Sequence, residues 1–356
     1  MAYTTIDDPS EYFTTTLYTG NESTNAITNS ANAGDFQPDW AWFKSRNSAT
    51  HHRLYDSSRG ALKNILSSAA NTEATTANSL TSFDSNGFTL GSDDNSNQNT
   101  KTFVAWQWKA NGGTTSSNTD GDITSTVQAN TTAGFSIVTF TGNATAGQTV
   151  GHGLGVKPEF IFAKNRSNGN NWNCYVEATD NTGDYTLTLN GTGARSNSFN
   201  MWNDTAPTSS VITLGDRNET NGSSHNMVFY CFHSIKGYSK FGKYTGNITS
   251  GSDGAFVYTG FKPAWIMVKS DSNSGQEWVI FDNKRDTFNQ MDAWLYANAT
   301  TTEDSTGDAR DVDFLSNGFK FRNAGGPTSY SGRTYIYMAF AEHPFVSSKG
   351  VPVTAR

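Results

Sequence analysis

The chain has 356 residues, of which 16% are charged, 35% are hydrophobic and 13% are aromatic. The aromatic content excludes a disordered chain, and the scarcity of strong helix formers argues against a helical protein. The net charge of −7, without any run of Lys and Arg, excludes nucleic acid and anionic membrane surfaces as partners. Abundant Thr and Asn with 33 Gly favour an all-β protein of short strands and polar turns.

Met1 is followed by the polar residues 2–8, which contain neither the basic nor the apolar part of a signal peptide. No apolar stretch approaches the roughly 20 residues of a membrane-spanning helix. We therefore expect synthesis in a cytoplasm without a conventional export signal, and no membrane insertion.

Three segments begin alike, with an aromatic residue two places before a Gly-Asn turn. About 17 residues later, each has a proline followed by an apolar strand that ends in lysine. The turns lie at Gly20-Asn21, Gly142-Asn143 and Gly246-Asn247, and the lysines are Lys44, Lys164 and Lys269. Proline is tolerated at the start of a strand, because its missing N–H removes no ladder bond there.

Further matches follow in the same order. Residues 54–59 resemble residues 280–285, and residues 83–90 resemble residues 314–321, both with an Asn-Gly hairpin signal. Aromatic strands at 103–108, 227–232 and 335–340 close the three copies. This pattern predicts three tandem β-sandwich units of the jelly-roll type, each about 100 residues long.

The expected boundaries follow from these matches and from composition. They are an N-terminal anchor segment at 1–16, unit 1 at 17–110, a linker at 111–132, unit 2 at 133–236 and unit 3 at 237–356. The linker is rich in Gly, Ser, Thr and Asn. Leu62, Ile65 and Leu66 lie at helical spacing and predict one short helix over residues 58–70.

The sequence lacks the common motifs of catalysis. It contains no phosphate-binding loop and no nucleophile elbow, and its histidines and acids lack metal-ligand spacing. We therefore predict no enzymatic activity, no cofactor and no metal. The pairs Asp56 with Arg59 and Asp282 with Arg285 follow apolar strands, and we interpret them as structural ion pairs that fix turns.

Two sets of residues leave alternatives open. Cys174 and Cys231 could form one disulfide, but two small buried side chains on strands are favoured. Trp40, Trp42, Trp106 and Trp108 pair at i, i+2 and so share a face of their strands. A sugar-stacking platform is one interpretation of these tryptophans, and a core position is the favoured one.

Six segments of the chain stand out together: residues 2–13 (AYTTIDDPSEYF), 17–21, 36–40, 54–61 (LYDSSRGA), 80–91 (LTSFDSNGFTLG) and 102–110. These segments resemble a family of marine bacteriophage virion proteins, found in phages of cyanobacteria and other ocean bacteria. The resemblance is tight over residues 1–110 and weaker beyond, where residues 152–158 still match. It implies a structural or tail-fibre-like protein, and it brings no catalytic residues with it.

These observations predict a non-enzymatic virion protein, a tail fibre or tail-associated component that contacts the host surface. The alternatives are a capsid decoration protein and a polysaccharide depolymerase or glycan-binding module. Expected partners are other virion proteins, further copies of the chain in a homo-oligomer, and a host surface glycan. The candidate glycan contacts lie in loops at 165–172 and 296–308 and near residue 330; they are Arg166, Trp172, Tyr296 and Tyr330.

Overall fold

The computed structural model describes residues 3–29, 35–249, 254–305, 310–323 and 325–352. The fold is almost entirely β, with 42% strand and 4% helix, so the all-β prediction is confirmed. The helices of the described residues are the one-turn segments η1 (Pro9–Glu11), α1 (Asp94–Asn97), α2 (Phe199–Trp202) and α3 (Asn218–Asn221). Among these residues, no helix has the length and apolar character needed to cross a membrane.

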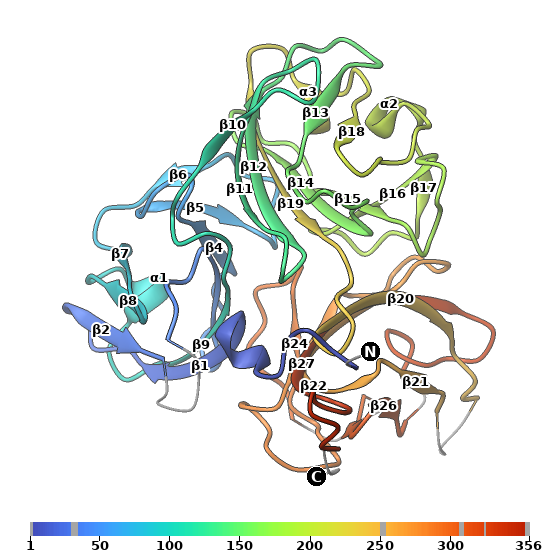
Figure 1. Ribbon diagram of the computed structural model, residues 1–356. Helices are drawn as coiled ribbons and strands as arrows, with labels where there is room; N and C mark the ends of the chain where they lie inside the picture. Colours follow the sequence, from blue (N-terminus) through green and yellow to red (C-terminus); the bar gives the residue numbers. More distant parts are fainter. Residues whose placement is uncertain (1–2, 30–34, 250–253, 306–309, 324, 353–356) are drawn as a thin grey trace.

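Three main antiparallel sheets surround the centre of the molecule (Figure 1). The first sheet has the order β1 (Phe13–Thr19), β9 (Thr102–Trp108), β3 (Trp40–Ser45), β4 (Arg53–Asp56), β5 (Lys63–Leu66), β6 (Ala74–Thr75). The second sheet has the order β10 (Ser116–Asn118), β11 (Ser125–Asn130), β12 (Phe135–Thr141), β19 (Asn226–Phe232), β14 (Phe160–Asn165), β15 (Asn173–Val176), β16 (Tyr185–Thr188), β17 (Ser196–Asn197). The third sheet has the order β20 (Ser239–Thr245), β27 (Thr334–Pro344), β22 (Phe261–Ser270), β23 (Val279–Asp282), β24 (Leu295–Tyr296).

A small sheet covers the outer face of each main sheet. The first is β2 (Asn25–Thr28), β8 (Gly87–Leu90), β7 (Leu80–Asp84); the second is β13 (Thr149–Gly151), β18 (Val211–Thr213); the third is β21 (Phe256–Tyr258), β26 (Gly318–Phe321), β25 (Val312–Leu315). The two predicted Asn-Gly hairpins are confirmed as the pairs β7–β8 and β25–β26. Each main sheet and its small sheet enclose a separate apolar cluster, which gives the sandwich its two layers.

The pairing of strands defines equivalent positions in the three main sheets. Trp40 pairs with Asp56 and Trp108, Phe160 pairs with Val176 and Phe232, and Trp265 pairs with Asp282 and Phe340. Counting along the strands from these pairs, Trp106, Tyr230 and Met338 are equivalent, as are Lys44, Lys164 and Lys269. The sheets can therefore be compared residue by residue.

The inner faces of the three main sheets share one aromatic core. Trp40 of the first sheet stacks on Tyr230 of the second, with 4.7 Å between ring centroids. Trp108 meets Trp265 of the third sheet at 5.7 Å, and Phe232 meets Phe340 at 6.0 Å. Aromatic rings bury large apolar areas, so this core makes each sheet depend on the other two. The core interpretation of Trp40, Trp42, Trp106 and Trp108 is confirmed, because each is at most 1% exposed.

The structure differs from the expected boundaries in two places. Residues 111–132 are not simply a linker, since they contain β10 and β11 of the second sheet. Composition misled there because Ser125 and Gln128 of β11 are polar yet buried. The helix expected at 58–70 is absent. Gly60 and Leu62 have positive φ angles (94° and 68°), which break a helix, and the chain then enters β5.

The described residues of the expected anchor segment, 3–16, are part of the folded molecule. Ile6 and Phe13 lie in the shared core, and β1 begins at Phe13. The Tyr3 hydroxyl donates to the Gly260 carbonyl at 2.8 Å, and Thr4 Oγ1 donates to the Lys236 carbonyl at 2.8 Å. Residues 1–2 of that segment lie outside the described residues. The segment near the end of the chain lies close by, where the Ser348 amide donates to Asp7 Oδ1 at 2.6 Å.

Candidate functional site at the junctions between the sheets

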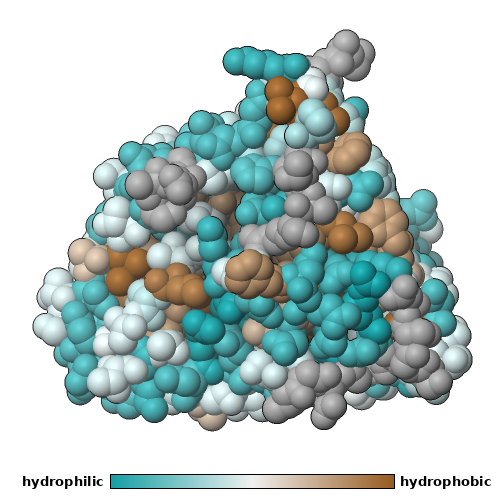
Figure 2. Space-filling view, turned by 90° about the horizontal axis from the view of Figure 1, so that it is seen from below, coloured by the Kyte–Doolittle hydropathy of each residue, from teal (hydrophilic) through white to brown (hydrophobic). Residues whose placement is uncertain are grey.

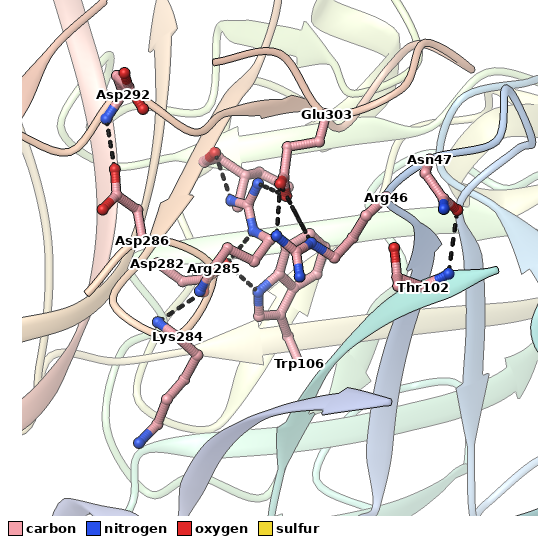
Figure 3. A network of polar contacts seen from close by, with 11 residues as sticks. Arg46, Asn47, Thr102, Trp106, Asp282, Lys284, Arg285, Asp286, Asp292 and Glu303 are labelled. Atoms are coloured by element: carbon pink, nitrogen blue, oxygen red, sulfur yellow. Dashed lines mark hydrogen bonds and ion pairs between the residues drawn. The ribbon is translucent and has the colours of Figure 1, made fainter. Parts of the chain in front are cut away.

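Polar residues connect the main sheets around the rim of the aromatic core, and we name each junction by the two sheets that meet there. At the first–third junction, Asp282 accepts hydrogen bonds from Arg285 Nε at 2.5 Å and from Trp106 Nε1 at 3.0 Å (Figure 3). Glu303 accepts from Arg285 at 3.1 Å and from both nitrogens of the Arg46 fork, at 2.7 and 3.0 Å. The side chains of Asp282 and Arg285 have no exposed surface.

The first–second junction repeats this arrangement. Asp56 accepts from the side chain and from the amide of Arg59, and from the Tyr230 hydroxyl at 2.6 Å. Glu73 accepts from Arg59 at 3.0 Å and from the Arg166 fork at 2.8 and 2.9 Å. Burial alone would lower the pKa of the Arg59 guanidinium, but Asp56 and its other partners raise it. Burial likewise opposes the Glu73 charge, yet the two guanidinium groups lower the pKa of Glu73.

The second–third junction departs from this pattern. The position of the aspartate is held here by Val176, and that of the arginine by Thr179. The position of Trp106 and Tyr230 is held by Met338. The remaining ion pair has reversed polarity: Asp271 stands at the position of Arg46 and Arg166, and Arg195 lies 3.5 Å from it. Backbone bonds keep the frame common to all three, since the amides of Glu73, Arg195 and Glu303 donate to the carbonyls of Arg166, Asp271 and Arg46.

Three equivalent lysines also cross the junctions. Lys44 donates to the Thr300 carbonyl at 3.3 Å, Lys164 to the Ala70 carbonyl at 3.2 Å, and Lys269 to the Gly193 carbonyl at 2.9 Å. All three are at most 1% exposed, and burial lowers the pKa of each to about 8. Carbonyl oxygens solvate each ammonium group, so a lysine at the end of each strand ties its sheet to the preceding one.

A fourth set of equivalent positions precedes β4, β15 and β23. Trp172 donates its indole N–H to the Leu66 carbonyl at 2.7 Å, and Trp278 donates to the Thr188 carbonyl at 3.0 Å. His52 takes this position at the first–third junction, where its Nδ1 accepts from Trp42 Nε1 at 2.8 Å. Burial, with the nearby charge of Lys44, lowers the pKa of His52 well below its usual value. The ring is therefore neutral at pH 7.

The structure places the four expected glycan-contact residues in different settings. Trp172 is buried in the core, so it offers no surface for a ligand, and Arg166 is engaged by Glu73. Tyr296 is half-buried in β24 under Arg310, whose guanidinium lies 5.4 Å from the ring. Tyr330 is 41% exposed, with Arg333 at 4.6 Å from its ring. The expectation of an exposed tryptophan loop was wrong because the indole closes a junction; residues 306–308 of the second loop lie outside the described residues.

The two cysteines are unbridged and lie inside the fold. Cys174 and Cys231 are free and buried, and their strands place them in different apolar clusters on opposite sides of the second sheet. Burial raises the pKa of both thiols, which opposes thiolate formation. Within the described ranges, no group of three or more His, Cys, Asp and Glu could hold a metal ion. The chemistry of the junctions is that of fixed ion pairs.

Sequence reasoning missed most of the cross-sheet partners. It identified Asp56 with Arg59 and Asp282 with Arg285 because these pairs are three residues apart, and the structure contains both ion pairs. Glu73 and Glu303 follow their arginines after 14 and 18 residues, so no common spacing marks them. The strand-ending lysines did carry a signal, since they recur in all three copies of the motif.

Comparison with known proteins finds one family. A family model described as a domain of unknown function (DUF7483) matches residues 8–344. No curated protein and no solved structure matches the chain. The matched region includes all three main sheets, so the family model treats them as a single domain.

Proposed function

The chain belongs to the DUF7483 family, and we propose that it is a non-enzymatic structural protein of a bacteriophage virion. In this proposal it is a tail fibre or tail-associated component, assembled with other virion proteins and with further copies of itself, and it contacts the host surface. The proposal begins from the resemblance of residues 2–13, 54–61 and 80–91 to marine phage virion proteins. It has no catalytic step and no cofactor.

The single observation that carries the proposal is the closed set of ties between the sheets. One lysine and one further charged side chain of each main sheet bind to one neighbouring sheet, and the equivalent side chains of the other neighbour bind to it in turn. These contacts surround a shared aromatic core. Such ties let no sheet open without exposing the core and uncovering buried charge, which is strongly unfavourable. That resistance to local opening suits a particle component that must persist outside a cell.

The surface is compatible with assembly into a particle. Figure 2 shows a face that is mostly hydrophilic, with hydrophobic residues in several separate groups. The exposed large apolar side chains include Phe288 at 77%, Tyr258 at 49% and Phe256 at 46%. Phe256 and Tyr258 lie on β21, an outer strand of the third small sheet, where further chains could pack.

The test is to locate the protein on purified particles of the phage that encodes it. Mass spectrometry of gradient-purified virions should detect the chain, and gold-labelled antibodies should mark the tail. Labelling over the head would favour a capsid decoration protein, and absence from purified virions would contradict the proposal. Release of reducing ends from host polysaccharide, abolished by one Asp or Glu substitution, would favour a depolymerase, whose two carboxylates must flank the scissile bond.

A further inference from the structure

A cavity of about 350 Å³ lies at the first–third junction, on the side where the described chain starts and ends. The segment before β1, strand β1, the end of β27 and the turn after β23 form its walls. Its lining includes Asp8, Phe13, Thr15, Asn283, Lys284 and Glu342. This volume falls at the lower end of the range for small-molecule sites, so it suits a ligand of monosaccharide size.

Asn283 is the unusual residue in this cavity. It is only 2% exposed, yet among the residues that the structure describes neither its amide oxygen nor its amide nitrogen has a hydrogen-bond partner. The buried hydroxyl of Thr15, which also lines the cavity, is in the same condition. Each such group costs about 1–3 kcal/mol when it is left unpaired, so the cavity wall favours a partner that both donates and accepts hydrogen bonds.

At the first–second junction, the residue equivalent to Asn283 has hydrogen-bond partners within the protein. Ser57 is equivalent to Asn283. The amide of each donates at 2.9 Å to the carbonyl of the residue just before the equivalent tryptophan, Trp40 or Trp265. That residue is Asp39 at the first–second junction, where its carboxylate accepts from the Ser57 hydroxyl at 2.7 Å. Gln128 of β11 then fills the remaining space and bonds to Ser58 at 2.8 Å.

At the second–third junction, charged side chains and a serine occupy the equivalent space. Glu177, equivalent to Asn283, accepts from Lys157 at 2.7 Å, and Glu159, equivalent to Asp39, is bonded by Ser234. At the first–third junction the residue before Trp265 is Ala264, which lies within β22 and has no polar side-chain group to offer the Asn283 amide side chain. The connecting chain that fills the other two junctions is replaced here by the segments near the two ends.

The lining selects the class of ligand. Acidic Asp8 and Glu342 are balanced by Lys284 in the lining and by Lys262, which lies 3.1 Å from Glu342. Figure 3 shows the Lys284 side chain directed away from the Arg285 network, although its amide donates to Asp282 Oδ1 at 3.1 Å. A balanced set of charges favours neither an anion nor a cation. The Asn283 amide and Thr15 hydroxyl suit paired hydroxyl groups, and Phe13 with Ala264 offers an apolar wall.

We propose that the cavity bounded by Phe13, Thr15 and Asn283 binds a neutral polyhydroxylated ligand, a single pyranose sugar unit. Asn283 and Thr15 hydrogen-bond adjacent hydroxyl groups of the sugar, and the apolar face of the ring lies against Phe13 and Ala264. The use of this binding for host contact rests on the proposed function, whereas the binding itself is a property of the isolated chain.

The experiment uses the full-length purified protein and ligand-observed NMR with glucose, galactose, mannose and N-acetylglucosamine as probes. We expect at least one of these sugars to show saturable binding below about 50 mM. Asn283→Ser should weaken it at least about tenfold, because a shorter hydroxyl group replaces the amide that donates and accepts. Ala264→Asp copies Asp39, should engage Asn283 from within the chain, and should also weaken binding while the protein stays folded.

The matched control is Asn273→Ser, the same change at a residue outside the cavity lining, and it should leave binding unchanged. Absence of saturable binding by all four sugars would overturn the inference, as would equal binding by the Asn283→Ser and Asn273→Ser proteins. Neither result depends on where the chain sits in a virion. A protein that is found on the tail but binds no sugar would therefore retain the proposed function and lose this inference.

Discussion

The first–third and second–third junctions have different residues at three equivalent positions: an aspartate, an arginine and an indole donor at the first, and uncharged side chains at the second. The first–third junction buries Asp282 and Arg285, and Trp106 of the neighbouring sheet donates to the carboxylate. At the second–third junction the equivalent positions are held by Val176, Thr179 and Met338. The aspartate–arginine pair of that junction, Asp271 with Arg195, lies at a different position. The aspartate, the arginine and the neighbour's donor are thus present together or absent together. At these equivalent positions the carboxylate is buried only where both partners accompany it, because they offset the cost of burying its charge.

The largest expected effect comes from breaking the polar junction at one residue. Asp282→Ala leaves the fully buried Arg285 guanidinium without its carboxylate and leaves the Trp106 indole without an acceptor. We expect a loss of about 3–5 kcal/mol in the free energy of unfolding, measured by denaturant titration. The exposed Asp216→Ala is the control and should change stability by less than about 0.5 kcal/mol. Equal losses in the two variants would contradict this account of the junction.

A second test transfers the three residues of the second–third junction to the first–third junction. It asks whether Asp282, Arg285 and Trp106 act as one group. The triple variant Asp282→Val, Arg285→Thr and Trp106→Met reproduces Val176, Thr179 and Met338. We expect it to recover about 2–3 kcal/mol relative to Asp282→Ala, since no buried charge is left unpaired. Denaturant titrations of both variants provide the comparison. If the triple variant is less stable than Asp282→Ala, the three residues of one junction cannot replace those of the other.

His52 predicts a pH dependence that is specific to the first–third junction, because Trp172 and Trp278 take its place at the others. Its folded-state pKa lies well below the unfolded value near 6.5, so the unfolded state binds the proton first. The contribution of His52 to the free energy of unfolding is therefore complete above pH 6.5 and decreases as the pH falls below that value. At pH 5.5 the loss should be larger, by about 1 kcal/mol, in the natural protein than in His52→Gln. Parallel pH profiles of the two proteins would contradict the assignment.

The lysines predict a weaker effect of the same sign, at higher pH. The folded-state pKa of Lys164 is about 8, below the unfolded value near 10.4, so the unfolded state holds more protons between these values. The contribution of Lys164 to stability should therefore rise with pH above 8, by about 1 kcal/mol at pH 9 relative to Lys164→Met. Chemical unfolding of both proteins at pH 7 and 9 measures it. A difference that does not change with pH would contradict the lowered pKa.

The smallest effect is expected outside the junctions. Tyr330 is 41% exposed and contacts Arg333, so Tyr330→Ala should change the free energy of unfolding by less than about 0.5 kcal/mol. Thermal unfolding measures this, and adsorption of the phage carrying the same change tests a role in host contact. A large destabilisation would mean that the loop supports the third sheet and is not merely a surface turn.

Local patterns in the sequence were enough to predict the β class, the hairpins at Asn86-Gly87 and Asn317-Gly318, and the three-residue Asp–Arg pairs. They failed where a residue's environment comes from another sheet. Trp172 follows a polar loop and looked exposed, yet it reaches the Leu66 carbonyl of the first sheet. Gln128 looked like part of a linker, yet it is buried because Ser57 and Ser58 bond to its amide. Sequence spacing carries no information on such distant partners.

The contact between Asp7 and Ser348 brings the two ends of the described chain together beside the first–third junction. The sheets are thus linked in a ring, in which two junctions are bridged by continuous chain and the third by the paired end segments. A circular permutant that joins these ends and opens the chain near Gly112 would keep every tie between the sheets. The order in which the sheets follow one another in the gene is then one of several that encode the same closed structure.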